Sequence, residues 1–391
     1  MTDFLTASWS YPTRVLTGVG SIRTLPQVTR DAGIANPLVV TDRGLKDAPM
    51  IANVMALLSQ AGIAGALFSD VQGNPTGDNL DAGVAAYRAG GHDGIVAVGG
   101  GSALDIGKGI ALMHGQTRPV WDFEDIGDWW TRADASLISP IIAVPTTAGT
   151  GSEVGRAGVI TNLATHEKKI IFHPLMLPKV AIEDPELSVG LPPLLTAGAG
   201  MDALAHCFEA FCVDSFHPIA DGIALEGLRI IDIHLPRAVK NGADLEARAY
   251  MLAAASMGAA AFQKGLGAIH SVSHPVGARF NSHHGLTNGV LFPYVIVANR
   301  PAIEEKLERV ARTLGLTGGF DAVLTWIVDL RAEIGVPHTL ADLGVGHGDV
   351  EGIAADAVND PTAGANPRRF TAEEFAVLTR AAIDGDLSFR I

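Results

Sequence analysis

Gly94-Ile95-Val96-Ala97-Val98-Gly99-Gly100-Gly101-Ser102 is the stretch of sequence that decides the fold. The residues up to Val98 favour a short buried strand, and residues 103–113 continue with the spacing of a helix. Glycines at such a junction let the backbone approach a diphosphate closely, while the first free N–H groups of the helix point toward the anion. The alternative is a simple tight turn, because the spacing differs from the usual dinucleotide fingerprint. The candidate phosphate-binding residues are Gly99, Gly100, Gly101 and Ser102.

The sequence around this stretch alternates short β-branched runs with helix-period segments, from Pro37 to about Pro145. Such alternation indicates βαβ units and a parallel sheet. The predicted strands cover residues 37–42, 65–68, 94–98 and 141–144, and the predicted helices between the first three cover residues 48–60 and 78–88.

The second half of the chain has a different pattern of residues. Long alanine-rich segments with a 3.6-residue period cover residues 193–212, 219–239 and 245–264, which predicts helices. A chain of 391 residues is also longer than one hydrophobic core usually holds. We therefore expect an α/β domain with a parallel sheet over residues 1–188 and an all-α domain over residues 189–391, with ligand sites at the seam between them.

Composition excludes several classes of partner. The formal net charge of −14 would repel a nucleic-acid backbone. No run reaches the roughly 20 uncharged apolar residues that a membrane span needs, and residues 1–4 show no start of a secretory signal. The two cysteines, Cys207 and Cys212, fit reduced, small hydrophobic residues better than a disulfide framework. We expect a soluble, cytoplasmic protein.

Two further segments could touch a bound cofactor. Asp42 ends a predicted strand, a position from which an acid can accept hydrogen bonds from an adenosine ribose. The alternative is an ordinary turn or helix-capping aspartate. Pro145-Thr146-Thr147-Ala148-Gly149-Thr150-Gly151-Ser152-Glu153-Val154 follows another strand and carries many hydroxyls and glycines. A plain Ser/Thr-rich connector would not need so many small donors, so we interpret it as a binding loop.

The helical half contains a possible set of metal ligands. Asp202 and His206 are four residues apart on a predicted helix, and His270 and His274 have the same spacing on another, so each pair shares a face. The histidine pair at 283–284 follows. One aspartate and several imidazoles suit a divalent transition metal such as iron or zinc. The alternative is a collection of separate surface or core histidines.

Taken together, these segments resemble the iron-containing, group III alcohol dehydrogenases, and the match covers nearly the whole chain. The matching residues are Gly99–Ser102 with Asp105 and Lys108, residues 145–154, 200–206, 270–285 and 357–361, and Asn366-Pro367-Arg368. Residues 261–267, with Gly155 and Arg156, look like the branch that contains 4-hydroxybutyrate dehydrogenases.

The resemblance implies an NAD-binding N-terminal domain and a metal-binding helical domain holding iron or zinc. By position, the implied metal ligands are Asp202, His206, His270 and His284. His283 departs from the family pattern, so the assignment to His284 rests on the following Gly285. His274 matches a histidine beside the metal that is linked to proton relay. The further cofactor contacts that the resemblance implies are Asn74, Thr146, Thr147, Thr150 and Lys168.

The cofactor and substrate can also be anticipated. Asp42 would repel a 2′-phosphate, which predicts NAD rather than NADP. Lys264 could hold a carboxylate at the far end of a short aldehyde, with Arg156 and Arg279 as helpers, and 4-hydroxybutyrate is the first expectation. Alternatively, Lys264 is a solvated cation at a helix end. The other candidate substrates are neutral diols, lactaldehyde, and sulfonated or phosphonated aldehydes.

Other functional classes and relatives stay open. A lyase of the dehydroquinate synthase type would only borrow NAD, and a silent scaffold would lack turnover. The complete set of one aspartate and three histidines argues against the metal-free maleylacetate reductase branch. The family resemblance also implies a homodimer or a larger homo-oligomer.

Overall fold

The computed structural model describes residues 13–165 and 167–391, which divide into two compact units. One unit ends at Gly190, and the other runs from Leu191 to Ile391. Residues 1–4, on which the expected absence of a secretory signal rests, lie outside the described residues. Among the helices that the structure describes, none is both long and apolar enough to cross a bilayer.

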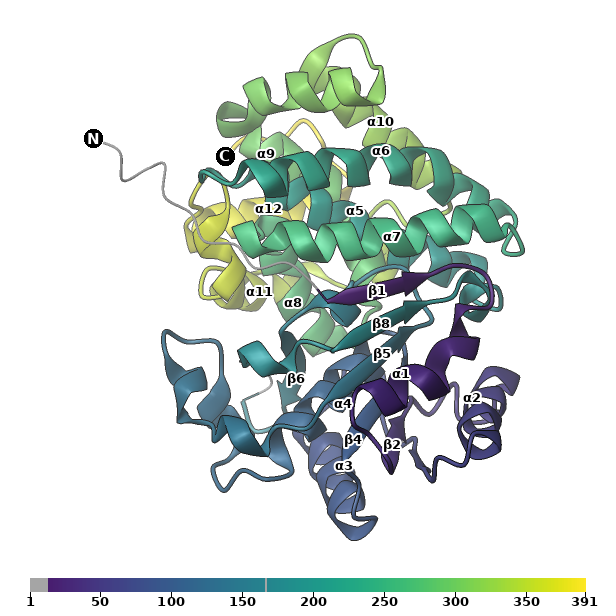
Figure 1. The fold of residues 1–391 in the computed structure, drawn as a ribbon. Helices are drawn as coiled ribbons and strands as arrows, with labels where there is room; N and C mark the ends of the chain where they lie inside the picture. Colours follow the sequence, from purple (N-terminus) through teal and green to yellow (C-terminus); the bar gives the residue numbers. More distant parts are fainter. Residues whose placement is uncertain (1–12, 166) are drawn as a thin grey trace. The chain divides into compact units, whose positions relative to one another are not determined.

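A six-stranded, wholly parallel sheet forms the centre of the first unit, in the order β1-β8-β5-β4-β2-β3 (Figure 1). The chain moves from β2 to β3 in one direction and from β4 to β5 in the other. The strand order therefore reverses between β2 and β4, the place where α/β sheets bind ligands. The strands are β1 (Arg14–Thr17), β2 (Pro37–Val40), β3 (Ala66–Phe68), β4 (Gly94–Gly99), β5 (Ile141–Pro145) and β8 (Val180–Glu183).

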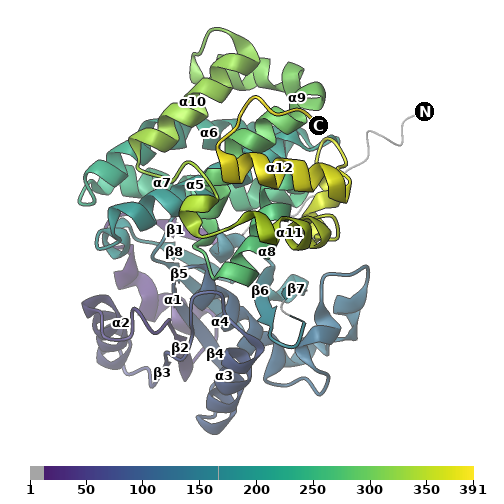
Figure 2. The same cartoon turned by 180° about the vertical axis from the view of Figure 1, so that it is seen from behind.

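Helices cover both faces of this sheet, because successive strand side chains point to opposite sides. Leu38 and Val40 pack in the core beneath α3 and α4, whereas Val39 packs beneath α1 and α2. Helices α1 and α2 lie in front of the sheet in Figure 1, and α3 and α4 lie in front of it in Figure 2. The helices are α1 (Leu25–Asp31), α2 (Pro49–Gln60), α3 (Gly77–Ala89) and α4 (Gly101–Met113).

The second unit is helical, and its centre is α5 (Pro193–Cys212), which is buried from Thr196 to its last residue. This helix packs against α6, α7 and α9, while α8 packs against α9 and α11. The remaining helices are α6 (Pro218–Lys240), α7 (Leu245–Ala261), α8 (Ala268–Phe280), α9 (His284–Leu314), α10 (Gly319–Glu333), α11 (Val350–Ala357) and α12 (Ala372–Asp384).

The predicted fold class, a parallel α/β domain followed by a helical domain, is confirmed. Some details differ. The strand predicted over residues 37–42 ends at Val40, so Asp42 lies in the turn that follows. The sequence patterns also did not indicate β1, β8 or the antiparallel hairpin of β6 (Ala157–Asn162) and β7 (Glu167–Phe172).

Candidate metal centre and nucleotide loop

Three helices of the second unit bring the predicted metal ligands together. Asp202 and His206 lie one turn apart on α5 and are buried. His270 lies in the first turn of α8 and is also buried, and His284 is the first residue of α9. The four residues therefore come from segments that are far apart in sequence but adjacent in this unit.

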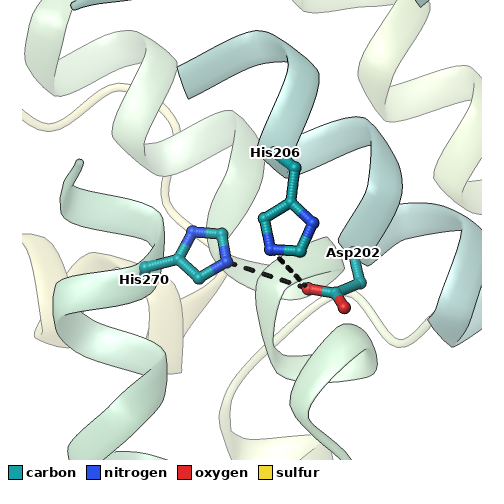
Figure 3. A group of neighbouring side chains, drawn as sticks. All are labelled: Asp202, His206 and His270. Atoms are coloured by element: carbon teal, nitrogen blue, oxygen red, sulfur yellow. Dashed lines mark ion pairs between the residues drawn. The ribbon is translucent and has the colours of Figure 1, made fainter. Parts of the chain in front are cut away.

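The imidazole nitrogens converge on one carboxylate oxygen. The Nε2 atoms of His206, His270 and His284 lie 3.6, 3.8 and 3.5 Å from Oδ1 of Asp202. Figure 3 shows the rings of His206 and His270 turned toward this oxygen. One ligand atom from each of Asp202, His206 and His270 lies within 4.8 Å of the others, a spacing that a shared metal ion can bridge.

A close contact between two glycines sets the position of His284. A Cβ atom at Gly285 would lie 2.0 Å from the carbonyl oxygen of Gly198 on α5, so only glycine lets α9 begin this close to α5. His283 caps α9, with its Nδ1 accepting a hydrogen bond from the N–H of Leu286 at 3.3 Å. The geometry thus gives adjacent histidines different positions, with His284 facing Asp202.

The electrostatics of the cluster favour an ionised aspartate. Burial acts to raise the pKa of Asp202, but the charges of His206 and His284 and a hydrogen bond from His270 outweigh it and hold the pKa below its ordinary value. Burial acts to lower the pKa of His270, whereas its partners Asp202 and Glu209 raise it to about 9. The buried carboxylate therefore needs positive charge beside it, which protons on the imidazoles supply here and which a metal ion would supply in their place.

This donor set fits a divalent metal ion. Three imidazole nitrogens and one carboxylate oxygen are ligands that iron and zinc accept. A single carboxylate oxygen has too few lone pairs to satisfy all three histidines and the amide of Asn288, which donates to it at 2.8 Å. The residues present therefore match the group that the resemblance implies.

Two residues of this cluster were not identified from the sequence. Glu209 accepts a hydrogen bond from Nδ1 of His270 at 2.6 Å, and Asn288 lies 3.3 Å from Nε2 of His284. The spacing of each residue from a predicted ligand could have indicated it. Glu209 is three residues after His206 on α5, and Asn288 is four residues after His284 on α9, so each shares a helix face with a ligand.

His274, the predicted proton-relay residue, lies on α8 beside the cluster. Its ring stacks on that of His284 with centroids 5.5 Å apart, and its Nδ1 lies 2.8 Å from Oδ2 of Asp360. Burial acts to raise the pKa of Asp360, but His274 and Thr362 lower it below its ordinary value. Asp360 belongs to a segment that supported the family resemblance, but the sequence alone did not give it this role.

The predicted nucleotide-binding residues of the first unit meet at the carboxyl ends of β2 and β4. Oδ1 of Asp42 accepts hydrogen bonds from the N–H groups of Gly44 and Leu45 at 2.8 and 3.1 Å. Its other oxygen, Oδ2, would lie 3.3 Å from a Cβ atom at Gly99. Asp42 therefore orders its own turn and also lies beside the glycine loop, and its contact with a ribose stays a prediction.

The threonine-rich loop packs directly against the glycine loop. A Cβ atom would lie 3.3 Å from Oγ1 of Thr147 if placed at Gly100, and 2.6 Å from Cγ2 of Thr150 if placed at Gly101. The N–H of Thr146 donates to the carbonyl of Gly99 at 3.0 Å. The two loops thus form one surface of small residues, with Ser102 in the first turn of α4.

A buried lysine fixes the far end of the threonine-rich loop. Nζ of Lys108 on α4 donates to Oγ of Ser152 at 2.5 Å and also to the carbonyl of Ala157. Ser152 in turn donates to Asp105 at 2.5 Å. Burial lowers the pKa of Lys108, and Asp105 opposes this effect. The network ties the loop to α4 and to β6.

The remaining predicted cofactor contacts, Asn74 and Lys168, are connected through the hairpin. Asn74 has a positive φ of 53° in the turn before α3. The N–H of Thr161 on β6 donates to the carbonyl of Pro75 at 2.7 Å, and Thr161 pairs with Lys168 across the hairpin.

The three predicted substrate-binding cations all have protein partners. Nζ of Lys264 lies 2.7 Å from Oδ1 of Asp221, and the lysine side chain is 2% exposed. This burial differs from the solvated helix-end cation that was the alternative. Arg279 pairs with Asp356 at 2.6 Å, and Arg156 lies over the ring of Phe172 in the first unit.

Comparison with known proteins identifies the family. The model of the iron-containing alcohol dehydrogenase family matches residues 12–185, and the model of the C-terminal domain of Fe-containing alcohol dehydrogenases matches residues 196–383. The chain therefore belongs to the iron-containing alcohol dehydrogenase family. It is an enzyme, an alcohol dehydrogenase of the iron type, as the sequence motifs predicted.

Individual relatives match more than nine tenths of the chain. It is 38% identical to 4-hydroxybutyrate dehydrogenase from Cupriavidus necator over 93% of this chain and 97% of that protein. The structure of a 1,3-propanediol oxidoreductase matches with a TM-score of 0.91 and 35% identity, covering 96% of this chain and 100% of the other. A sulfoacetaldehyde reductase from Bifidobacterium kashiwanohense, solved with NAD+, matches with a TM-score of 0.86 and 28% identity, covering 96% and 99%.

Proposed function

We propose that this enzyme is a metal-dependent, NAD-linked dehydrogenase that interconverts a small primary alcohol and its aldehyde. The observation that carries the proposal is the convergence of three imidazole Nε2 atoms on Oδ1 of Asp202. When bound, a divalent metal supplies Lewis acidity that makes an alcohol more acidic and polarises a carbonyl, and NAD exchanges a hydride with the substrate. The proposed metal ligands are Asp202, His206, His270 and His284.

His274 is the proposed proton acceptor. Because Asp360 is a carboxylate that can only accept, Nδ1 of His274 carries the proton of their hydrogen bond, and in a neutral ring the lone pair is then at Nε2. An imidazole in this state can take the alcohol proton and release it to solvent.

The proposed cofactor is NAD rather than NADP, because Asp42 would repel a 2′-phosphate. The compact surface formed by the glycine and threonine loops supports binding of a dinucleotide, since small residues let a backbone approach the diphosphate, and the choice of NAD over NADP rests on Asp42 alone. The proposed contacts are Asp42, Asn74, Gly99, Gly100, Gly101, Ser102, Thr146, Thr147, Thr150 and Lys168.

The metal is proposed to be Fe2+, with Zn2+ as the alternative that the same ligands accept. The test removes the metal from the full-length enzyme, restores Fe2+ or Zn2+, and follows NADH formation and bound metal. His206→Ala and His270→Ala should abolish both metal content and turnover. His234→Ala, which removes another buried histidine of the second unit that stacks on Tyr250, should retain both. Full turnover in the metal-stripped wild type would rule the proposal out.

For the substrate, we propose a short ω-hydroxy acid, with 4-hydroxybutyrate and succinic semialdehyde first. Support comes from the similarity to the dehydrogenase of Cupriavidus necator. The proposed partners of the substrate carboxylate are Lys264, Arg156 and Arg279. A substrate carboxylate would have to compete with Asp221 for Lys264. Neutral diols and sulfonated aldehydes are the second candidates, because other relatives carry those names.

The substrate test compares kcat/KM for succinic semialdehyde with that for butyraldehyde. A charge-assisted hydrogen bond of roughly 1.5–3 kcal/mol predicts a preference for the acid of about ten- to a hundredfold in the wild type. Lys264→Ala should remove this preference. The single variant also leaves the carboxylate of Asp221 without its cation, so the double variant Lys264→Ala/Asp221→Ala serves as the control. If the preference persists in both variants, Lys264 does not bind the carboxylate. If the wild-type enzyme shows no preference for succinic semialdehyde over butyraldehyde, a short ω-hydroxy acid is not the substrate.

A further inference from the structure

Glu209 is a buried carboxylate on α5 that no step of the proposed reaction uses. Its side chain receives two hydrogen bonds from the start of α8. The N–H of Ile269 donates to Oε1 at 2.7 Å, and Nδ1 of His270 lies 2.6 Å from Oε2. Only 3% of the residue is exposed, and a buried carboxylate is retained at such a place when its oxygens are hydrogen-bonded.

This pairing decides which nitrogen of His270 carries a proton. An ionised carboxylate has no proton to give, so the short contact requires an N–H at Nδ1. In a neutral ring the lone pair is then at Nε2, the nitrogen that lies 3.8 Å from Oδ1 of Asp202. The opposite tautomer would place two acceptors against each other at 2.6 Å.

A second residue shares the task of capping α8 without touching a histidine. Oδ1 of Asn366 accepts the N–H of Ala268 at 3.1 Å, next to the N–H that Glu209 accepts. Gly267 leaves room for both, since a Cβ atom there would lie 2.7 Å from Oδ1 of Asn366 and 3.0 Å from Oε1 of Glu209. Capping and tautomer control are therefore separable by substitution.

We propose that Glu209 is a positioning residue that holds His270 in the tautomer whose Nε2 can bind the metal, in addition to capping α8. The inference rests on the proposed metal site. Outer partners of metal-bound histidines typically change metal affinity by about 10- to 100-fold when they are replaced.

Glu209→Gln is the diagnostic change, because glutamine keeps the shape but has only one accepting oxygen. Whichever way its amide is turned, an N–H group faces either the ring of His270 or the N–H of Ile269. The first orientation demands the wrong tautomer, and the second loses a helix cap. Asn366→Ala is the matched control, because it removes the neighbouring cap and leaves the histidine partner in place.

The experiment measures Co2+ affinity of the metal-stripped, full-length enzyme by competition with a chelating dye, together with the Tm of each metal-free variant. Glu209→Gln should weaken Co2+ binding about 10- to 100-fold, whereas Asn366→Ala should lower Tm with little effect on affinity. Equal losses of Co2+ affinity in the two variants would mean that Glu209 acts only as a cap of α8, and would overturn the inference. Absence of Co2+ binding by the wild type would instead overturn the proposed metal site, so the two failures are distinguishable.

A second measurement uses only the wild-type enzyme, so it does not depend on the folding of a variant. In the zinc-loaded wild type labelled with 15N-histidine, the ring of His270 should show a proton on Nδ1 that exchanges slowly with water. A His270 ring with its proton on Nε2 would contradict the assignment directly.

Discussion

Single atoms of three side chains carry much of the proposed chemistry. Oδ1 of Asp202 faces three imidazoles, Oδ2 of Asp360 fixes Nδ1 of His274, and Oδ2 of Asp42 faces the glycine loop. Each is a carboxylate oxygen with a defined neighbour, so replacing the acid by its amide or by glycine tests one contact at a time.

Asp360→Asn should slow turnover and leave the metal in place. The amide cannot hold the Nδ1 proton of His274 as an ionised carboxylate does, so the ring loses its fixed tautomer and becomes a poorer proton acceptor. We expect kcat to fall by roughly 10- to 100-fold with unchanged metal per chain, measured by steady-state kinetics and elemental analysis. Asp384→Asn, which removes the partner of exposed His347, is the control. A loss of metal in Asp360→Asn would show a structural role instead.

Asp42→Gly should relax the preference for NAD. Removing one negative charge near the expected 2′-phosphate should narrow the ratio of kcat/KM for NAD+ and NADP+ by roughly tenfold, which corresponds to about 1.4 kcal/mol and lies between the repulsion of about 1 kcal/mol in bulk water and about 4 kcal/mol near a protein surface. Asp47→Gly removes a charge from the same loop, where the side chain is 89% exposed, and should leave the ratio unchanged. A wild type that prefers NADP+ would refute the role of Asp42.

Among the elements, helices were more predictable than strands. The period of residues 193–212 predicted α5 and placed Asp202 and His206 on one face, because a helix repeats every 3.6 residues. The strands β1 and β8 span four residues each, which is too short for a period of two to stand out. Glu209 and Asn288 shared faces with the ligands, but sequence spacing alone could not reveal their partners on another helix. Likewise, nothing in the local sequence indicated that Lys264 pairs with Asp221, 43 residues away.

Gly285→Ala should separate the start of α9 from α5. The new Cβ would meet the carbonyl oxygen of Gly198 at 2.0 Å, so α9 must move and carry His284 away from Asp202. Overpacking of this kind costs about 1–3 kcal/mol, and we expect a lower Tm together with weaker metal binding. Gly222→Ala on α6, where a Cβ would meet nothing within 4 Å, should be neutral or slightly stabilising. Normal metal affinity in Gly285→Ala would show that the position of His284 does not depend on the close contact between α9 and α5.

Across the whole molecule, the two proposed ligand sites draw on different units. All four proposed metal ligands belong to the unit from Leu191 to Ile391, and all proposed nucleotide contacts belong to the unit that ends at Gly190. Each ligand can therefore stabilise its own unit through binding energy, whatever the other unit does.

Hydrogen exchange should resolve these two effects. At a hundredfold excess over its Kd, a ligand adds about 2.7 kcal/mol to the stability of the state that binds it. Zn2+ added to the metal-stripped enzyme should slow exchange chiefly in α5, α8 and α9, and NAD+ added alone should slow it chiefly at the ends of β2 and β4 and in the first turn of α4. Protection of only the first unit by Zn2+ would contradict the proposed ligands.

The unbroken course of α5 has a consequence for how this sequence can change. Asp202, His206 and Glu209 occupy one helix, so their relative directions are set by the number of residues between them. Inserting or deleting one residue between Asp202 and Glu209 would rotate everything beyond it by roughly 100° about the helix axis. Length changes within this helix would therefore disrupt the site, whereas the turn between α6 and α7, where Asn241 and Ala243 are exposed, can accept them more readily.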